Sequence, residues 1–114
     1  MKTETKNARG VVMAYIDALD SQDFDFASSF IDENVKITGP AGEGFGKPRN
    51  FTDMLKRYSG KYDIKREFVD GNEVCLLYDY HTSGNVVYMC SWYKVKDGKI
   101  EFIRTVFDPA AFST

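Results

Sequence analysis

Apolar residues recur every three or four positions over residues 5–19, which is the spacing of an amphipathic helix. The pattern stops at residue 20, and Asp23 is placed to cap a second helix. This second helix is expected to bury Phe30 and to end near residues 32–34. The chain is therefore predicted to begin with two short helices that each bury one face.

The middle of the chain alternates between short elements and turn-forming residues. Residues 35–38 are a short strand candidate, and residues 39–46 then hold four glycines and one proline, which predicts an irregular surface loop. A third short helix is expected over residues 51–60, capped by Asn50 or Thr52 and closed by its last glycine.

The second half reads as strands joined by tight turns. Asp97-Gly98 lies between two strand-forming runs and is a strong hairpin signal. Helices first and strands later are typical of an α+β domain, in which helices cover one face of a curved antiparallel sheet. The chain is expected to form one domain over residues 1–114, with strands over 62–69, 73–82, 86–96 and 99–108.

Three segments resemble the nuclear transport factor 2-like superfamily, especially its SnoaL-like members. They are YIDALDSQDFDFASSFIDENVKITGP, GKPRNFTDML and VKDGKIEFIRTVFDP, which together cover nearly the whole chain. The resemblance implies a cone with the cystatin-like arrangement of a bent, mixed sheet wrapped around the N-terminal helices, with a pocket at the open end. The superfamily hosts isomerases, cyclases, dehydratases, epoxide hydrolases and members without chemistry, so the fold alone does not select an activity.

The catalytic positions of ketosteroid isomerase are only partly matched. Tyr15 fits the helix tyrosine that donates a hydrogen bond to the enolate, but Gly39 stands before Pro40 where the family has its aspartate base. Ser91 stands at the position of the second, protonated aspartate. Two of three roles are missing, which argues against steroid-type isomerisation.

Limonene-epoxide hydrolase is matched no better. Its arginine and aspartate on the strand before the last hairpin correspond to Met89 and Ser91, and the acidic residue of its last strand corresponds to Thr105 or, with a shifted alignment, Asp108. A water-activating set of carboxylates is therefore not visible in this sequence.

The face of the sheet to which the side chains of Asp79 and His81 point depends on the length of the turn after Thr82. A two-residue turn after Thr82 puts Tyr78 on the face of Ser91 and leaves Asp79 and His81 on the opposite face, whereas a three-residue loop reverses this. Two-residue turns are the commoner hairpin connection, which favours an outward pair. Facing inward, Asp79 would orient His81 as a general base.

The resulting hypothesis is an apolar pocket that binds a small hydrophobic molecule, with cofactor-free acid/base chemistry as its potential activity. Tyr15 would donate a hydrogen bond, and either His81 with Asp79, or Asp108, would be the base. A non-catalytic dimerisation or binding module is the first alternative, and an isomerase- or cyclase-like enzyme is the second. The residues expected to line the pocket are Tyr15, Phe30, Met54, Tyr58, Tyr78, Met89, Ser91, Tyr93, Thr105 and Phe107.

Composition excludes several other classes. A net charge of −2 argues against nucleic acid as the main partner, and no apolar run is long enough for a membrane span or a signal peptide, so a cytoplasmic location is expected. One histidine cannot build a multi-histidine metal site, and no phosphate-cradling motif indicates an organic cofactor.

Trp92, Tyr88 and Cys90 are expected on the outer sheet face, where an aromatic patch indicates a homodimer interface. Cys75 and Cys90 are expected to be reduced thiols that lie within strands and behave as small hydrophobes.

Overall fold

The structure is a computed structural model that describes residues 7–39, 42–45, 60–82 and 84–108. Helix α1 spans Ala8–Asp20 and begins at Asn7, whose side chain accepts a hydrogen bond of 2.7 Å from the amide of Gly10. Helix α2 spans Phe24–Ser28 and is capped by Asp23 in the same way. Both predicted N-terminal helices are confirmed. Neither is long and apolar enough to cross a lipid bilayer, and the described residues contain no other helix.

The second helix is shorter than the sequence predicts. It ends at Ser28, and strand β1 already begins at Ile31 and runs to Gly39. Ile31 pairs with Ile100 of the last strand, and the amide of Ile100 donates a 2.7 Å hydrogen bond to the carbonyl of Phe30. The helical spacing of the apolar residues is overridden here because this segment pairs with a distant strand.

The glycine-rich loop prediction is also wrong in part. Gly42–Phe45 forms strand β2, which pairs antiparallel with β1 from Gly39↔Gly42 to Lys36↔Phe45. Glycine is a weak strand former, but the backbone ladder does not depend on side chains, and β2 lies at the edge of the sheet. The third helix predicted over residues 51–60 lies outside the described residues, apart from Gly60.

The predicted four-stranded meander is confirmed. It consists of β3 (Lys61–Asp70), β4 (Glu73–Thr82), β5 (Asn85–Lys96) and β6 (Lys99–Val106), each antiparallel to the next. Asp97 and Gly98 have φ of 52° and 78°, as a two-residue hairpin turn requires. Strand β1 adds to β6 in parallel, so the sheet is mixed, with the order β2-β1-β6-β5-β4-β3.

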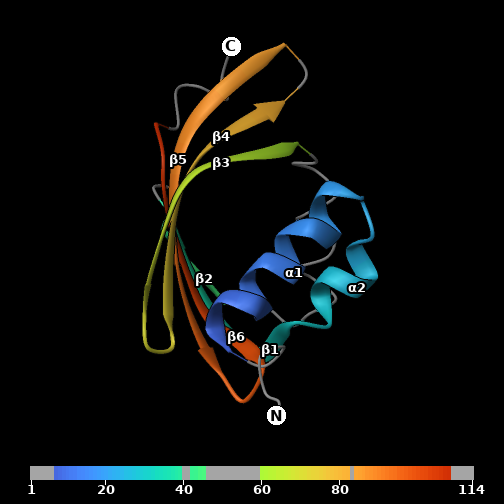
Figure 1. The fold of residues 1–114 in the computed structure, drawn as a ribbon, viewed down its shortest axis with the longest axis vertical. Coiled ribbons are helices and arrows are strands. Elements are labelled where there is room, and N and C mark those ends of the chain that lie inside the picture. The colour runs from blue at the N-terminus through green and yellow to red at the C-terminus, as the bar shows by residue number, and fades with distance from the viewer. Residues whose placement is uncertain (1–6, 40–41, 46–59, 83, 109–114) are drawn as a thin grey trace.

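The sheet curves around helix α1, which lies on its concave side with α2 beside it (Figure 1). Irregularities in register accompany this curvature: the β3–β4 ladder shifts between Ile64 and Arg66, and the β5–β6 ladder shifts between Lys94 and Val95. Such bulges bend a strand and increase its twist. An α+β cone with a bent, mixed sheet is therefore the observed architecture.

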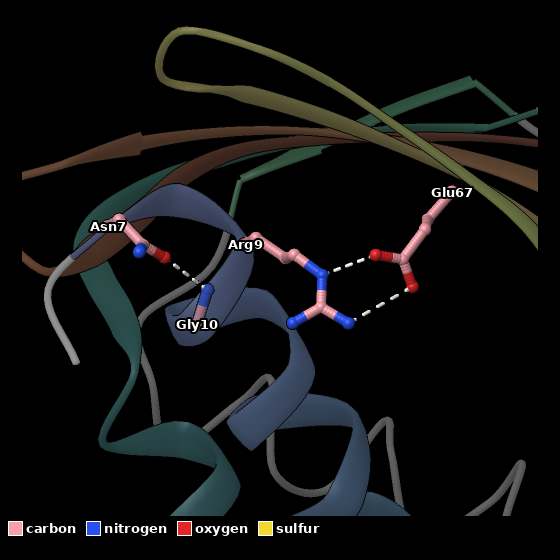
Figure 2. A network of polar contacts seen from close by, with 4 residues as sticks. All are labelled: Asn7, Arg9, Gly10 and Glu67. Carbon is pink, nitrogen blue, oxygen red and sulfur yellow. Dashed lines mark hydrogen bonds and ion pairs between the residues drawn. The ribbon is translucent and has the colours of Figure 1, made fainter. Parts of the chain in front are cut away.

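Helix α1 is tied to strand β3 at both ends. At its C-terminal end the carboxylate of Asp20 accepts a hydrogen bond of 3.0 Å from the amide of Tyr62, and the side chain of Lys61 donates to the Asp20 carbonyl. At its N-terminal end the guanidinium of Arg9 forms an ion pair with the carboxylate of Glu67 (Figure 2). Between these ties the helix buries its apolar face against the sheet, through Ala8, Val11, Val12, Tyr15, Ile16, Ala18 and Leu19.

Candidate functional site

The hairpin between β4 and β5 decides which side chains face the helix. Thr82 pairs with Asn85, so the connection has two residues and Leu76 lies opposite Ser91 on the concave side. The alternation predicted for a two-residue turn is thereby confirmed. The buried side chains of β4 that face α1 are Val74, Leu76, Tyr78 and Tyr80, and those of β5 are Val87, Ser91, Tyr93 and Val95.

Five tyrosines converge on this interior from four elements: Tyr15 on α1, Tyr62 on β3, Tyr78 and Tyr80 on β4, and Tyr93 on β5. The ring of Tyr62 lies 4.9 Å from that of Tyr78 and 5.2 Å from that of Tyr80. Tyr15 meets Tyr93 edge to face, with ring centroids 6.2 Å apart. Such pairs add to the stabilisation from burial alone, and each ring brings one hydroxyl into an apolar region.

A chain of hydroxyl groups crosses three neighbouring strands inside the sheet. The hydroxyls of Tyr78 and Ser91 share a hydrogen bond of 2.7 Å, and those of Ser91 and Thr105 share one of 3.0 Å. Ser91 is only 1% exposed and is the one polar residue among the fully buried residues that the structure describes. A buried hydroxyl without a partner would be destabilising. The two hydrogen bonds between these three hydroxyls therefore allow polar atoms to lie in the interior at little cost in stability.

The hydroxyl of Tyr80 makes a different contact, at the point where the chain enters β3. It accepts a hydrogen bond of 2.8 Å from the amide of Gly60. A β-carbon at Gly60 would lie 2.6 Å from the Tyr80 ring, closer than van der Waals contact allows. Glycine is therefore required here, because the backbone passes directly over the tyrosine ring.

Burial keeps these tyrosines neutral. It raises the pKa of Tyr15 far above its ordinary value, and the neighbouring Tyr78 and Tyr80 raise it further. The pKa of Tyr62 and that of Tyr93 are raised well above 10.0 for the same main reason. Burial also raises the pKa of Tyr78, although its hydrogen bond to Ser91 opposes this. Neutral phenols donate hydrogen bonds, so these groups suit an oxygen acceptor and do not serve as bases.

Several residues expected in the pocket do lie toward this interior. Tyr15, Tyr78, Ser91 and Tyr93 are buried in it, and Phe30, Met89 and Phe107 pack against the same core with partial exposure. Thr105 completes the hydroxyl chain. Met54 and Tyr58 lie outside the described residues.

The pocket role considered for Asp79 and His81 is corrected by the register. Asp79 pairs with Tyr88 and His81 with Val86, and all four face away from α1 because the connecting turn has two residues. Asp108 follows β6 and is exposed. No carboxylate or imidazole of the described residues is fully buried in the interior, and the partly buried carboxylate of Asp20 lies at its edge beside Tyr62 and Tyr80.

Asp79 and His81 instead belong to a polar cluster on the outer face. Together with Asp63 of β3, their potential ligand atoms lie within 4.8 Å of one another. The ammonium of Lys65 lies 2.9 Å from Asp63 and 3.9 Å from Asp79, so a cation already balances these carboxylates. The hydrogen bond from Lys65 lowers the pKa of Asp63, and His81 contributes in the same direction. This arrangement is a solvated ion cluster in which Lys65 balances the carboxylates.

Two members of the tyrosine cluster were missing from the expected site. Tyr80 shares the alternation of Tyr78, and its inward direction follows once the turn length is known. Tyr62 alternates with Ile64 on β3, and both are partly buried against the core. The alternation of these residues can be read from the sequence. That helix α1 packs against this face of the sheet cannot be read from the local pattern.

Comparisons with known proteins agree with this geometry. The family model of the SnoaL-like domain matches residues 12–103. An NTF2-like protein of unknown function from Cytophaga hutchinsonii superimposes with a TM-score of 0.89 at 29% identity, covering 100% of both chains. No curated protein matches the sequence.

More distant structures share the fold alone. An LEH-like epoxide hydrolase from M. tuberculosis is 23% identical, with a TM-score of 0.79 over 96% of this chain and 87% of its own. A de novo designed protein with a curved β-sheet is 22% identical, with the same TM-score over 99% of this chain and 93% of its own. A designed protein and an epoxide hydrolase can thus share one backbone, and the activity has to be argued from side chains. The family match and the shared architecture together establish that this chain belongs to the SnoaL-like domain family.

Proposed function

We propose that this SnoaL-like domain binds a small, uncharged and mainly apolar molecule that carries an oxygen acceptor. The observation that carries the proposal is the hydroxyl chain of Tyr78, Ser91 and Thr105 beneath helix α1. Binding sites for small molecules are typically apolar with a few placed polar groups. Here the apolar part is supplied by the aromatic rings and the aliphatic core, and the polar part by hydroxyls.

The charge of the interior favours a neutral ligand. The described interior holds no arginine, lysine or histidine that could balance an anion, and no carboxylate that could balance a cation. Tyr15, Tyr78 and Tyr93 stay protonated at neutral pH, so their hydroxyls add no charge to this interior. Moving an unpaired charge into this region would be strongly unfavourable.

Binding without catalysis fits the described residues better than acid/base catalysis. Proton abstraction needs a base within hydrogen-bond reach of the ligand. The fully buried polar groups of the described interior are neutral hydroxyls, and the partly buried carboxylate of Asp20 at its edge already accepts a hydrogen bond from the amide of Tyr62. The isomerase- or cyclase-like alternative would need a base from another part of the chain. Asp108 is the remaining candidate from the sequence, and Asp108→Asn would test its role if turnover of any ligand were found.

The proposal can be tested with naphthalene, 2-naphthol and 2-naphthoate, which share a ring system and differ in one group. The bound population is measured by shifts in the protein amide NMR spectrum. We expect 2-naphthol to bind about tenfold more tightly than naphthalene, the ratio for one hydrogen bond worth about 1.4 kcal/mol. We expect 2-naphthoate not to bind, because its charge would have no partner.

Tyr78→Phe and Tyr88→Phe form a matched pair of variants for this test. Tyr78→Phe removes an interior hydroxyl and should reduce the preference for 2-naphthol, whereas Tyr88 is 79% exposed on the outer face and its variant should behave like the wild type. Equal affinity for naphthol and naphthalene, or shifts confined to the outer face, would contradict the proposal. No binding of any probe would indicate an interior packed shut by its tyrosines.

A homodimer through the outer sheet face is a second, compatible proposal. Leu77, Tyr88 and Val106 are 40%, 79% and 59% exposed, and Cys90 lies between Leu77 and Val106 on neighbouring strands. Exposed apolar side chains gathered on one face are typical of contacts between proteins. A second copy is the occupant we propose, because the patch lies on three neighbouring strands, β4, β5 and β6, and can face itself across a two-fold axis. Light scattering of the wild type and Tyr88→Glu tests this: the wild type should be dimeric and the variant monomeric.

A further inference from the structure

The two cysteines of the chain meet on the outer face of the sheet. Their sulfur atoms, Sγ of Cys75 on β4 and Sγ of Cys90 on β5, lie 3.4 Å apart. Both thiols are free and both residues are partly exposed. The sequence contains no other cysteine, so each has the other as its only possible partner within the chain.

The register explains why the two sulfurs come so close. Cys75 pairs directly with Trp92, and Cys90 pairs directly with Leu77, so the cysteines are diagonal neighbours across the β4–β5 ladder. Sheet twist brings one diagonal of each pair closer, within reach of side chains. A disulfide requires about 2.04 Å between the sulfurs, so they must approach by only about 1.4 Å.

This thiol pair takes no part in the proposed binding site. Residues at positions 75 and 90 face away from α1, whereas the hydroxyl chain and the tyrosine cluster face toward it. The pair is also not a buried core filler, because neither cysteine belongs to the buried residues of the sheet.

We propose that Cys75 and Cys90 form a redox-sensitive dithiol that is oxidised reversibly to a cross-strand disulfide by small-molecule disulfides of the glutathione type. Two proximal thiols held by a rigid ladder favour the intramolecular bond over two separate adducts, because the second thiol is already in place when the first has reacted. Partly exposed disulfides are the ones that exchange readily with such reagents.

The exchange proceeds in two balanced steps. One protein thiol loses its proton to solvent, and the resulting thiolate attacks a sulfur of the small disulfide RSSR. A mixed protein–SR disulfide forms, and the first RS⁻ leaves and takes up a proton. The second protein thiolate then attacks the protein sulfur of the mixed disulfide and expels the second RSH. The net reaction converts two protein thiols and one RSSR into one protein disulfide and two RSH.

The two thiols influence each other's ionisation. Burial raises the pKa of Cys90 to about 11, and the neighbouring Cys75 adds to that shift. A thiol with a raised pKa supplies less thiolate and reacts more slowly with an external disulfide. The short distance between the sulfurs therefore compensates for this low acidity once one of the two thiols has reacted.

The location of the pair connects oxidation to the proposed dimer. A second copy seated on the outer face would cover both thiols and slow their reaction with a reagent in solution. Oxidation is therefore expected to be faster in Tyr88→Glu than in a dimeric wild type. In the cytoplasm expected for this protein, the pair would be reduced at rest and would respond to a rise in disulfide reagents.

The test equilibrates the full chain in buffers with different ratios of reduced to oxidised glutathione. Intact mass spectrometry after acid quenching should show loss of two hydrogen atoms in a monomer, with a midpoint inside the accessible range of ratios. Addition of dithiothreitol should restore the original mass. The fluorescence of Trp92, the only tryptophan and the direct cross-strand partner of Cys75, gives an independent optical signal.

Single-cysteine variants separate the two steps. Cys90→Ser should accumulate a glutathione adduct on Cys75, and Cys75→Ser should accumulate one on Cys90. Each variant should show an adduct and no intramolecular bond. Serine is nearly the same size as cysteine, and the wild-type measurement does not depend on either variant folding.

Three results would overturn the proposal. The first is a wild type that ends as a stable glutathione adduct or as a disulfide-linked dimer. The second is a wild type in which both thiols persist at the most oxidising ratio, also in Tyr88→Glu. The third is a bond that glutathione and dithiothreitol cannot reverse. Failure of the naphthol experiment would leave this proposal standing, because the two faces of the sheet are tested by different readouts.

Discussion

The two faces of this sheet differ in kind although both carry apolar residues. On the concave face, Val74, Leu76 and Tyr78 are at most 4% exposed and lie beneath helix α1. On the convex face, Leu77 and Tyr88 are 40% and 79% exposed and alternate with charged residues such as Asp79. Polar atoms inside are neutral hydroxyls joined in a chain, whereas those outside are ions that pair in water. Adjacent residues of one strand thus lie in two different environments, the apolar interior and water.

This contrast identifies what each face can do. Burial makes the inner face the main source of stability, because the hydrophobic effect scales with the apolar area removed from water. The outer face contributes little to the fold of a single chain and is free to take part in contacts with other molecules. Four experiments test that division, in order of decreasing expected effect.

Alkaline pH should abolish the fold through the inner face. The tyrosines buried there have pKa values raised above 10.0 by burial, including Tyr15, Tyr62 and Tyr93. A raised folded-state pKa gives a stabilising contribution that is fully present below about pH 10 and is lost as pH rises through the folded-state value. Urea unfolding from pH 8 to 12 should show a steep loss of stability above about pH 10.

Tyr93→Phe provides the control for the alkaline experiment. It removes one of the ionisable groups from the interior, so the loss of stability above about pH 10 should become shallower. Below that pH the two proteins should follow parallel curves. An identical loss of stability with pH in wild type and variant would show that ionisation of Tyr93 costs the folded state no stability, contrary to its burial.

Neighbouring leucines of β4 offer a direct comparison of the faces. Leu76 is 0% exposed and Leu77 is 40% exposed, and the side chains point in opposite directions. Leu76→Ala should lower the free energy of unfolding by about 2–5 kcal/mol, because it leaves a cavity in the core. Leu77→Ala should cost under about 1 kcal/mol. Chemical denaturation of both variants measures the difference, and equal losses would contradict the contrast between the faces.

The hydroxyl chain should have a smaller but measurable effect. Tyr78→Phe removes the bond of 2.7 Å to Ser91 while keeping the aromatic ring, and should cost about 1–2 kcal/mol of stability. The hydroxyl of Ser91 keeps its bond to Thr105, which limits the loss. Tyr88→Phe on the outer face should change the stability by less than about 0.5 kcal/mol in the same assay. A neutral Tyr78→Phe would mean that water replaces the missing hydroxyl.

The outer ion cluster should contribute least. The hydrogen bond from Lys65 lowers the pKa of Asp63 below 3.8, and both side chains are well exposed. A lowered folded-state pKa gives stability that is present above about pH 3.8 and lost as pH falls through the folded-state value. Asp63→Asn should remove only this shallow acid-side dependence, and about 1 M salt should mask it in the wild type. A large effect at neutral pH would show that the cluster is structural.

The alternation of residues predicted the two faces, but not which one the helices cover. The pattern of Tyr78, Asp79, Tyr80 and His81 is compatible with either direction until the length of the turn after Thr82 is known. The observed two-residue turn settles it, and Asp79 and His81 leave the candidate site. Local periodicity predicts which side chains share a face. Which of the two faces points inward depends on the turn, because one additional residue in it would reverse them.

Elements that depend on backbone pairing with another strand were predicted least well. Strand β2 was missed because Gly42 and Gly44 are poor strand formers and the pairing with β1 is made through the backbone. The early start of β1 at Ile31 was missed because its partner, Ile100, is far away in the sequence. Tyr15 and Ser91, by contrast, do lie in the interior: helical periodicity put Tyr15 on the apolar face of its helix, and the family resemblance implied the position of Ser91. The proximity of Cys75 and Cys90 follows from a diagonal contact that periodicity does not encode.

The parallel pairing of β1 with β6 has a consequence for how the chain folds. Lys36, Ile37 and Thr38 pair with Phe102, Ile103 and Arg104, so an early segment cannot reach its final place until nearly all of the chain is available. Contacts between such distant residues slow folding, because the entropy of closing the intervening loop is lost before the contact forms. During synthesis, the N-terminal helices would be made well before strand β6, with which β1 pairs. A chain that stops before residue 99 would leave apolar residues of the interior exposed and would be prone to aggregate.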